Sequence, residues 1–387
     1  MKIYDILILG AGASGLMCAS QLDKRWQVGV VDVNAKVACK LKISGGGKCN
    51  FTNVHVGVDN FDADAEFIAC ALETFSRDDL LDFFQKNGVQ SLLRKERYYF
   101  CKESADEIID VLKKHSRHVE MLLERKILNV KKVEDIFFIQ TSKGLLQSKK
   151  LILATGGKSY ATLGASEIGL DIAKSFGLQV KEFSPALVGM TLQKEQFWMK
   201  ELSGLSAYVH IKVEGKILKE EMLFAHRGIS GPAVLSASLY WKKGNISIDF
   251  LPNEDVLKLI HNSNKLLSSV LALPKRLSKE ILSALNIEDV MCKKLTSQAG
   301  KQLQRIHNYE FAPAGNFGFT KAEASRGGIL TQELNPQSLE ALKVKNFYCI
   351  GEVVDVTGEL GGYNFQWAFS SGAACAFSIN KVLKSSK

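Results

Sequence analysis

Apolar and polar stretches at the start of the chain predict a strand, a turn, a helix and a second strand. Residues 3–9 form a short apolar run rich in β-branched side chains, and the sequence GAGASG follows directly at positions 10–15. Apolar residues then recur at helical spacing over 16–22, and a second apolar run at 28–31 ends in Asp32. This order is typical of one βαβ unit with a parallel strand pair.

The rest of the chain alternates between helical and strand-like patterns. Helical periodicity over 65–87 ends at Asn87-Gly88, and Ser104 with Glu107 predicts a capping box before the next helix. The remaining predicted strands are 119–123, 136–141, 151–154, 207–213, 245–250 and 347–350, and a last helix is predicted from Asn364.

The succession of patterns predicts an α/β protein whose first domain is interrupted by an insertion. Residues 190–252 are rich in predicted strands, residues 253–307 read as helical, and the final strand and helix return to the first domain. The predicted segments are 1–189 (the opening segment of the first domain), 190–252 (small β insert), 253–307 (helical insert), 308–330 (return through the β insert) and 331–387 (the closing segment of the first domain).

Composition narrows the class of protein. The chain has 387 residues, 46% hydrophobic and 24% charged, which excludes a disordered tail, a collagen and a disulfide-rich miniprotein. It has no apolar run of about 18 residues, and its start lacks a signal-peptide pattern, so we expect a cytoplasmic protein without a membrane partner. None of its eight cysteines forms a CxxC pair, so we expect free thiols and no metal site.

The net charge of +9 leaves two interpretations open. A basic surface attracts RNA or DNA, and residues 253–307 hold nine Lys and Arg against five Asp and Glu. The same excess of cations also serves solubility alone.

The turn after the first strand carries a full GxGxxG motif, made by Gly10, Gly12 and Gly15 around Ala13 and Ser14. The first glycine permits the tight turn, the second lets a pyrophosphate approach the backbone, and the third lets helix and strand pack closely. The helix N-terminus offers N–H groups to the phosphates. Asp32, at the end of the second strand, is placed to accept hydrogen bonds from ribose hydroxyls.

Two later segments favour FAD over NAD. An apolar strand closes on Ala154-Thr155-Gly156, and Gly351-Glu352 ends another strand before a GGYNFQ segment opens the last helix. Backbone N–H groups and a helix start in such a segment stabilise negative charge on the pyrimidine edge of a reduced flavin. A second GxGxxG is absent from the sequence, so we expect NAD(P)H to bind only transiently, as a reductant.

Four segments resemble the BaiN/YhiN-type family of FAD-dependent oxidoreductases. They are ISGGGKCNFTN at 43–53, LFAHRGISGP at 223–232, LPKRL at 273–277 and GEVVDVTGELGGYNFQWAFSSG at 351–372. The resemblance implies a Rossmann-like FAD domain of the glutathione-reductase type, interrupted by a β-barrel-like domain and a helical domain.

The same resemblance implies a set of residues at or near FAD. They are Gly10, Gly12, Ser14, Gly15, Asp32, Lys40, Ser44, Gly45, Gly46, Gly47, Lys48, Ile127 (through its backbone), Thr155, Gly156, Asp355, Gly362, Tyr363, Asn364 and Phe365. Two positions depart from the family pattern. Ala38 stands where a glycine is common, and Lys48 replaces an arginine, which keeps the charge but loses the bidentate fork.

Within that family, the chain is most similar to the subgroup that reduces a uridine of large-subunit ribosomal RNA to dihydrouridine. The resemblance implies an enzyme that passes hydride from flavin to the C5=C6 bond, which also needs an acid for the second carbon. Candidates near the reacting base are Cys101 and His226 as the acid and Arg227 as an anion or carbonyl contact. His226 alternatively caps a helix beginning at Ile229.

Two other functions stay open on the sequence alone. One is an oxidase or ene-reductase of a small metabolite, and the other is an RNA-binding assembly factor in which FAD is only structural.

Overall fold

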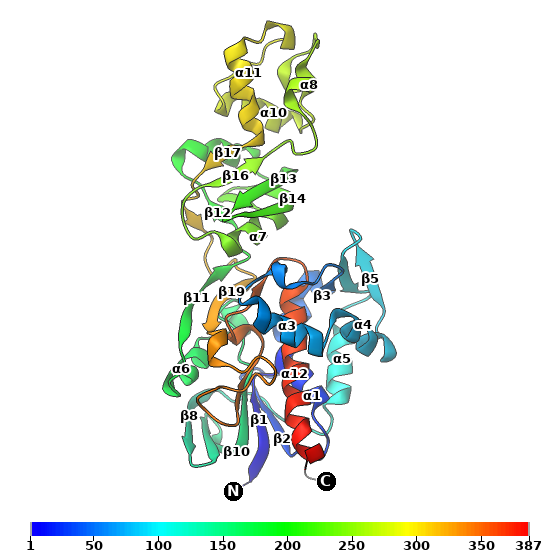
Figure 1. The fold of residues 1–387 in the computed structure, drawn as a ribbon, viewed down its shortest axis with the longest axis vertical. Helices are drawn as coiled ribbons and strands as arrows, with labels where there is room; N and C mark the ends of the chain where they lie inside the picture. The colour runs from blue at the N-terminus through cyan, green and yellow to red at the C-terminus, as the bar shows by residue number, and fades with distance from the viewer. Residues whose placement is uncertain (1, 386–387) are drawn as a thin grey trace. The chain divides into compact units, whose positions relative to one another are not determined.

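The chain forms two compact units in the computed structural model, which describes residues 2–385 (Figure 1). The first unit comprises Met1–Ser184 and Ala324–Lys387, and the second comprises Pro185–Glu323. The N-terminal and C-terminal stretches therefore share one unit, and the predicted class, an α/β fold with an insertion, is confirmed. The finer boundaries predicted at 189/190, 252/253, 307/308 and 330/331 stay predictions.

The first unit is built on a seven-stranded sheet, in which β1, β2, β7 and β20 run parallel to one another and to the end of β10. The antiparallel strands β8, β9 and β10 extend it on one side. Leu9 pairs with both Val31 and Leu153, so the carboxyl ends of three strands meet at one edge. The strands are β1 (Ile3–Leu9), β2 (Val28–Val31), β7 (Glu120–Leu122), β8 (Ile127–Val133), β9 (Ile136–Thr141), β10 (Gly144–Leu153) and β20 (Phe347–Cys349).

Helices from the two ends of the chain lie side by side in this unit. Figure 1 shows the red α12 beside the blue α1, with α5 next to them. The backbones of α1 and α12 approach closely, because a Cβ on Gly372 would lie 2.5 Å from the carbonyl oxygen of Ser14. The helices are α1 (Ala13–Gln21), α2 (Cys39–Ile43), α3 (Ala65–Thr74), α4 (Arg77–Lys86), α5 (Asp106–His115), α6 (Ile168–Ser175) and α12 (Tyr363–Ser385).

The single helix predicted over 65–87 is wrong, because the chain breaks between α3 and α4. Ser76 caps α4: its hydroxyl accepts from the N–H of Asp79 at 3.2 Å, and the Asp79 carboxylate accepts from the N–H of Ser76 at 2.9 Å. A local capping box therefore overrides continuous periodicity. The other predicted box is partly present, since Glu107 accepts from the N–H of Ser104 at 3.0 Å.

Three small sheets complete the first unit. One is antiparallel in the order β3–β6–β5, the second pairs β4 with β21, and the third pairs β11 with β19 where the chain leaves and re-enters the unit. Their strands are β3 (Asn50–Asn53), β4 (Phe61–Asp62), β5 (Ser91–Arg94), β6 (Tyr98–Cys101), β11 (Val180–Ala186), β19 (Ala324–Ile329) and β21 (Thr357–Gly358).

The second unit contains a seven-stranded sheet in the order β17–β16–β13–β14–β15–β12–β18, with antiparallel pairs throughout. Its strands are β12 (Met190–Thr191), β13 (Ser206–Val213), β14 (Lys216–Ala225), β15 (Gly228–Ser230), β16 (Ile246–Asp249), β17 (Tyr309–Phe311) and β18 (Gly315–Asn316). Its helices are α7 (Pro232–Tyr240), α8 (Val256–Ile260), α9 (Leu267–Val270), α10 (Lys275–Ala284) and α11 (Ser297–Leu303). The last four lie between β16 and β17 in sequence, within the range of the predicted helical insert.

Candidate functional site

The glycine-rich turn between β1 and α1 packs too closely for side chains at two of its three glycines. Gly10 has φ +117°, and a Cβ there would lie 2.2 Å from the carbonyl oxygen of Ala154. A Cβ on Gly15 would lie 2.0 Å from the carbonyl oxygen of Gly10. At Gly12, by contrast, an added Cβ would meet no atom within 4 Å. The turn thus holds strand and helix together and leaves open space at position 12.

That open space lies at the N-terminus of α1. Gly12 caps the helix without a side-chain hydrogen bond, and the first turn contains no acidic residue. The first N–H groups of a helix have no partner inside it, and the helix dipole favours a negative charge there. A phosphate fits both features.

Asp32 lies at the end of β2, next to this turn. One of its carboxylate oxygens accepts from the N–H of Ala11 at 2.7 Å, and the other accepts from the N–H of Asn34 at 2.8 Å. These contacts fix the orientation of the half-buried carboxylate. The side-chain amide of Asn34 also donates to the carboxylate, at 3.0 Å, so about one of its roughly four acceptor sites remains for a hydroxyl donor. The backbone N–H of Arg125 donates to the Asp32 carbonyl oxygen at 2.8 Å, so the chain shortly before β8 lies next to the end of β2. The role of Ile127 stays a prediction.

The loop at 38–49 follows the turn and contains a run of left-handed backbone. Gly45, Gly46 and Gly47 have φ of +56°, +67° and +84°, and the space around Gly46 and Gly47 would admit a Cβ. Ala38 also has a positive φ of +58°. The positive φ gives a physical reason for the glycine that is common there, because only glycine adopts this region at no steric cost.

Lys40 and Glu352 link this loop to the C-terminal part of the first unit. The Lys40 ammonium lies 2.8 Å from one Glu352 carboxylate oxygen and 3.0 Å from the other. Glu352 also accepts from the N–H of Ser325 at 2.9 Å. The Ser325 hydroxyl in turn accepts from the N–H groups of Lys158 and Ser159 at 2.8 and 3.0 Å. Sequence reasoning missed Ser325, since nothing in its local pattern marks it.

The turns after β10 and β20 approach the same region. Gly156 has φ +72°, and the nearest atom to an added Cβ would be a Glu352 oxygen at 3.8 Å. The hydroxyl of Thr155 is buried without a hydrogen-bond partner, and it faces Gly169 of α6. A Cβ on Gly351 would lie 2.4 Å from the Ser14 hydroxyl. The turn after β20 is therefore packed directly onto the start of α1.

The segment before α12 is held rigidly. The amide of Asn364 forms two hydrogen bonds with Gly358, one to its N–H and one to its carbonyl oxygen, both 2.9 Å. Tyr363 is buried against Phe61, with ring centroids 6.1 Å apart, and burial raises the pKa of its hydroxyl. Phe365 stacks on Phe369 at 6.2 Å. The Asn364 amide therefore fixes the turn that leads into α12.

Other predicted cofactor residues are engaged by neighbours. Asp355 accepts from the N–H of Gly327 at 3.1 Å and pairs with Lys181 at 3.1 Å. The Lys48 ammonium donates to the Lys102 carbonyl oxygen at 3.2 Å, and the Ser44 hydroxyl donates to the Leu41 carbonyl oxygen at 2.7 Å.

The three predicted catalytic residues are divided between the two units, with Cys101 in the first and the other two in the second. Cys101 is fully buried at the end of β6, and burial raises the pKa of its thiol. A thiol with a raised pKa gives up its proton less readily, and a general acid works best with a pKa near the operating pH, so burial disfavours Cys101 as the acid. His226 and Arg227 lie in the turn between β14 and β15 of the second unit and are exposed, with the Arg227 guanidinium 5.1 Å from the Phe317 ring centroid. Their catalytic roles stay predictions.

The helix that His226 would cap does not begin at Ile229, so that prediction is wrong. Residues 228–230 form strand β15, and α7 begins at Pro232 after Gly231. The antiparallel pairing of β14 and β15 extends through Ser230, so the helix cannot begin until Pro232. Gly231, with φ +86°, is its N-cap.

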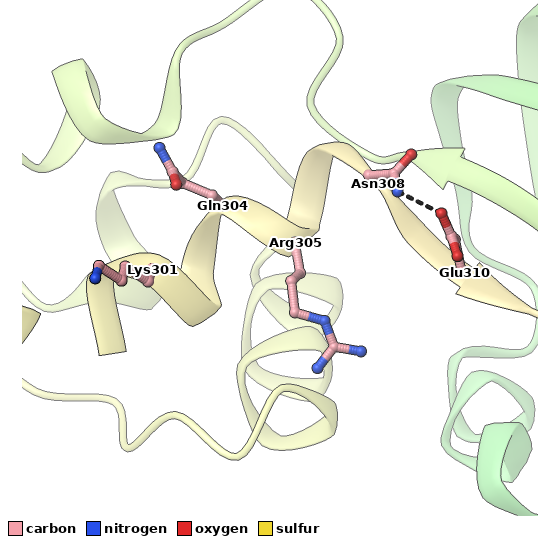
Figure 2. Close-up of a pocket in the computed structure, with 5 residues that line it drawn as sticks. All are labelled: Lys301, Gln304, Arg305, Asn308 and Glu310. Carbon is pink, nitrogen blue, oxygen red and sulfur yellow. Dashed lines mark hydrogen bonds between the residues drawn. The ribbon is translucent and has the colours of Figure 1, made fainter. Parts of the chain in front are cut away.

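The second unit also has a pocket, and none of the residues that line it was predicted as a site residue. Figure 2 shows its lining side chains, Lys301, Gln304, Arg305, Asn308 and Glu310, with a hydrogen bond from the Asn308 amide to Glu310 at 2.6 Å. Two cations and one carboxylate make it a basic pocket.

The first unit fits FAD. All of the predicted cofactor residues lie in this unit, which has open space at the α1 N-terminus and over Gly46 and Gly47 and a carboxylate just after β2. These are the features that a dinucleotide requires: a phosphate site on a helix start and a ribose acceptor beside it. Within residues 2–385, no cluster of His, Cys, Asp and Glu could hold a metal ion.

Comparison with known proteins agrees with this geometry. The family described as "HI0933-like protein Rossmann domain" matches residues 4–378. The chain belongs to that family. This membership confirms the BaiN/YhiN-type resemblance and the Rossmann-type FAD-binding fold, and it makes the HI0933-like chain an FAD-dependent oxidoreductase.

Two relatives span nearly the whole chain. "Ribosomal RNA dihydrouridine synthase" of Escherichia coli (strain K12) is 38% identical, covering 97% of this chain and 98% of its own length. "3-dehydro-bile acid delta(4,6)-reductase" of Clostridium scindens is 27% identical and covers 94% of this chain and 96% of its own length.

A solved structure shares the fold. 3-Ketosteroid delta1-dehydrogenase from Sterolibacterium denitrificans has a TM-score of 0.51 and 11% identity, covering 99% of this HI0933-like chain and 100% of the other. Among residues 2–385, none of the helices combines the length and apolarity that a bilayer crossing requires.

Proposed function

We propose that this protein reduces the C5=C6 bond of a uridine in large-subunit ribosomal RNA, using FAD and NAD(P)H. The observation that carries this proposal is the 38% identity, over 97% of the chain, to a protein named ribosomal RNA dihydrouridine synthase. The net charge of +9 also suits a polyanionic substrate.

Bound FAD supplies a hydride donor that is recharged by NAD(P)H. In the net reaction the C5–C6 π bond breaks, one carbon gains a hydride and the other a proton, and NAD(P)H is oxidised to NAD(P)⁺. The N–H groups at the start of α1 bind the pyrophosphate, and Asp32 orients the adenosine ribose.

The chain's remaining residues position these groups. The Lys40–Glu352 pair and Ser325 hold the loop at 38–49 against the turn after β10. The N-terminus of α12, where Asn364 fixes the preceding turn, would stabilise negative charge on a bound reduced flavin. Cys101 and His226 are the proposed acids, and Arg227 is a proposed contact to an anion or carbonyl of the substrate.

Complementation tests this function. We expect the chain to restore dihydrouridine in large-subunit ribosomal RNA when it is expressed in an E. coli strain that lacks its own synthase. Asp32→Ala should lose FAD and fail to restore the modification, while Asp59→Ala, an acidic residue outside the site, is the matched control. If the strain makes the wild-type protein well and in its yellow form but its ribosomal RNA still lacks the dihydrouridine, the proposal is falsified.

A second candidate function is the reduction of a conjugated double bond in a small molecule. The 27% identity to a bile-acid reductase over 94% of the chain favours it. A yellow protein that NAD(P)H bleaches, and that an enone but not RNA reoxidises, would support this candidate. RNA binding without any turnover would instead support the assembly factor with structural FAD.

A further inference from the structure

The β5–β6 hairpin of the first unit is an exposed, basic projection beside the proposed FAD site. β5 is the edge strand of its sheet (Figure 1). All four of its residues are exposed. Residues 90–102 contain four basic residues, Arg94, Lys95, Arg97 and Lys102, and one acidic residue, Glu96. Arg94 ends the strand and Lys95 follows it in the turn, so the cations at this end of the hairpin favour contact with a polyanion.

The two arginines of this hairpin are held against aromatic rings. The Arg94 guanidinium lies 4.6 Å from the Phe100 ring centroid, and that of Arg97 lies 4.5 Å from the Tyr98 centroid. A guanidinium held over a ring loses less conformational entropy when its N–H edge binds a phosphate. The ring contacts therefore prepare these side chains for anion binding.

The same aromatic rings contact two segments of the proposed FAD site, the turn before α12 and the loop at 38–49. A Cβ on Gly361 would lie 2.6 Å from the Tyr98 ring, and the Gly361 carbonyl oxygen accepts from the Asn53 amide at 2.9 Å. A Cβ on Gly45 would lie 3.0 Å from the Phe100 ring. Each ring thus contacts a cofactor loop and an arginine of the hairpin.

We propose that the β5–β6 hairpin binds the RNA backbone next to the target uridine, with Arg94 and Lys95 contacting phosphates. This inference rests on the proposed function. Tyr98 and Phe100 join the hairpin to Gly361 and Gly45. Phosphates held by the hairpin therefore place a neighbouring nucleotide beside the proposed FAD site. The half-exposed Leu92 and Leu93, at 41% and 46%, offer apolar surface for a base or sugar.

Binding of a fluorescein-labelled oligouridine of about 12 nucleotides tests the proposal. The comparison uses three double variants of the full FAD-loaded protein: Arg94→Gln/Lys95→Gln, the matched control Lys113→Gln/Lys114→Gln on exposed positions of α5, and Lys301→Gln/Arg305→Gln in the basic pocket of Figure 2. Thermal midpoints and visible spectra confirm that each variant is folded.

We expect Arg94→Gln/Lys95→Gln to bind about ten-fold more weakly at moderate salt. The slope of log K against log salt concentration should be smaller in magnitude by roughly 1.4, which corresponds to two lost phosphate contacts. The variant Arg94→Lys should recover most of the salt dependence, since it keeps the charge. Lys113→Gln/Lys114→Gln should bind as the wild type does.

The proposal is overturned if Arg94→Gln/Lys95→Gln binds RNA like the control, or if only Lys301→Gln/Arg305→Gln weakens binding. It is also overturned if the wild type binds an acidic peptide but not RNA. The dihydrouridine measurement on ribosomal RNA decides the proposed function separately, so the two failures are distinguishable.

Discussion

Lys40 and Glu352 form an ion pair across 312 positions of sequence, with the ammonium 2.8 Å from the nearer carboxylate oxygen. The pair joins the loop after β2 to the turn after β20, which are the two ends of the proposed cofactor site. Their side chains are 33% and 21% exposed, so water screens the attraction only in part.

Removing this pair should loosen both the fold and the hold on FAD. Because partly exposed pairs contribute about 1 kcal/mol, a double-mutant cycle with Lys40→Met and Glu352→Gln should give a coupling of about 1 kcal/mol in the free energy of unfolding. FAD affinity, measured by flavin fluorescence, should fall about five-fold in each single variant. Additive single effects would show that the two side chains act independently.

Gly12 and Gly15 should respond to the same substitution in opposite ways. A Cβ at Gly12 enters open space, so Gly12→Ala should keep the free energy of unfolding of the FAD-free protein close to the wild-type value, while the visible flavin absorbance of the purified protein falls. A Cβ at Gly15 would lie 2.0 Å from a backbone oxygen, so Gly15→Ala should lose about 3 kcal/mol of stability. Urea unfolding of the FAD-free proteins measures both stabilities. Full flavin retention in Gly12→Ala would remove the phosphate role of this turn.

Buried strands and glycine turns were predictable because their signals are local. The stretch at 3–9 is apolar apart from Asp5 and ends at Gly10, and the stretch at 28–31 is apolar and ends at Asp32; the structure has β1 and β2 at these residues. The GxGxxG motif was recognisable because a tight turn and close backbone packing require glycine at fixed positions.

Contacts over long separations and unusual turns were not predictable. Ser325 joins the site through hydrogen bonds to residues more than 160 positions away, and no local pattern marks it. The β5–β6 hairpin was missed because Lys95 and Glu96, with φ of +48° and +56°, occupy the turn positions that asparagine and glycine usually fill. In both cases the packing of distant segments decides the local structure.

Stability should fall as the pH rises above about 9. Burial raises the pKa of Cys49 to about 12 and raises the pKa values of Cys101 and Cys349, so the folded state keeps protons that the unfolded thiols release near pH 8.5. The unfolded state then binds fewer protons, and each such thiol costs up to about 1.4 kcal/mol per pH unit between the unfolded and the folded pKa.

Urea unfolding between about pH 7 and 10, under reducing conditions, measures this slope. Cys349→Ala should reduce the slope of the free energy of unfolding against pH by the equivalent of about one proton. A slope that is unchanged by Cys349→Ala would mean that this thiol ionises equally in both states.

Cys101 is one of the two proposed proton donors, and its substitution separates the two halves of the reaction. Loss of a general acid costs a factor of about 100 to 10,000, so Cys101→Ala should slow uridine reduction by at least about 100-fold. Reduction of the enzyme by NAD(P)H needs no such proton and should change far less. Cys375→Ala is the matched control, because its thiol is also fully buried with a raised pKa but has no proposed role in proton transfer. Stopped-flow absorbance follows the flavin in both steps: bleaching by NAD(P)H, then return of colour when RNA is added. Equal rates of colour return in Cys101→Ala and in the wild type would transfer the acid role to another group, with His226 the next to be tested.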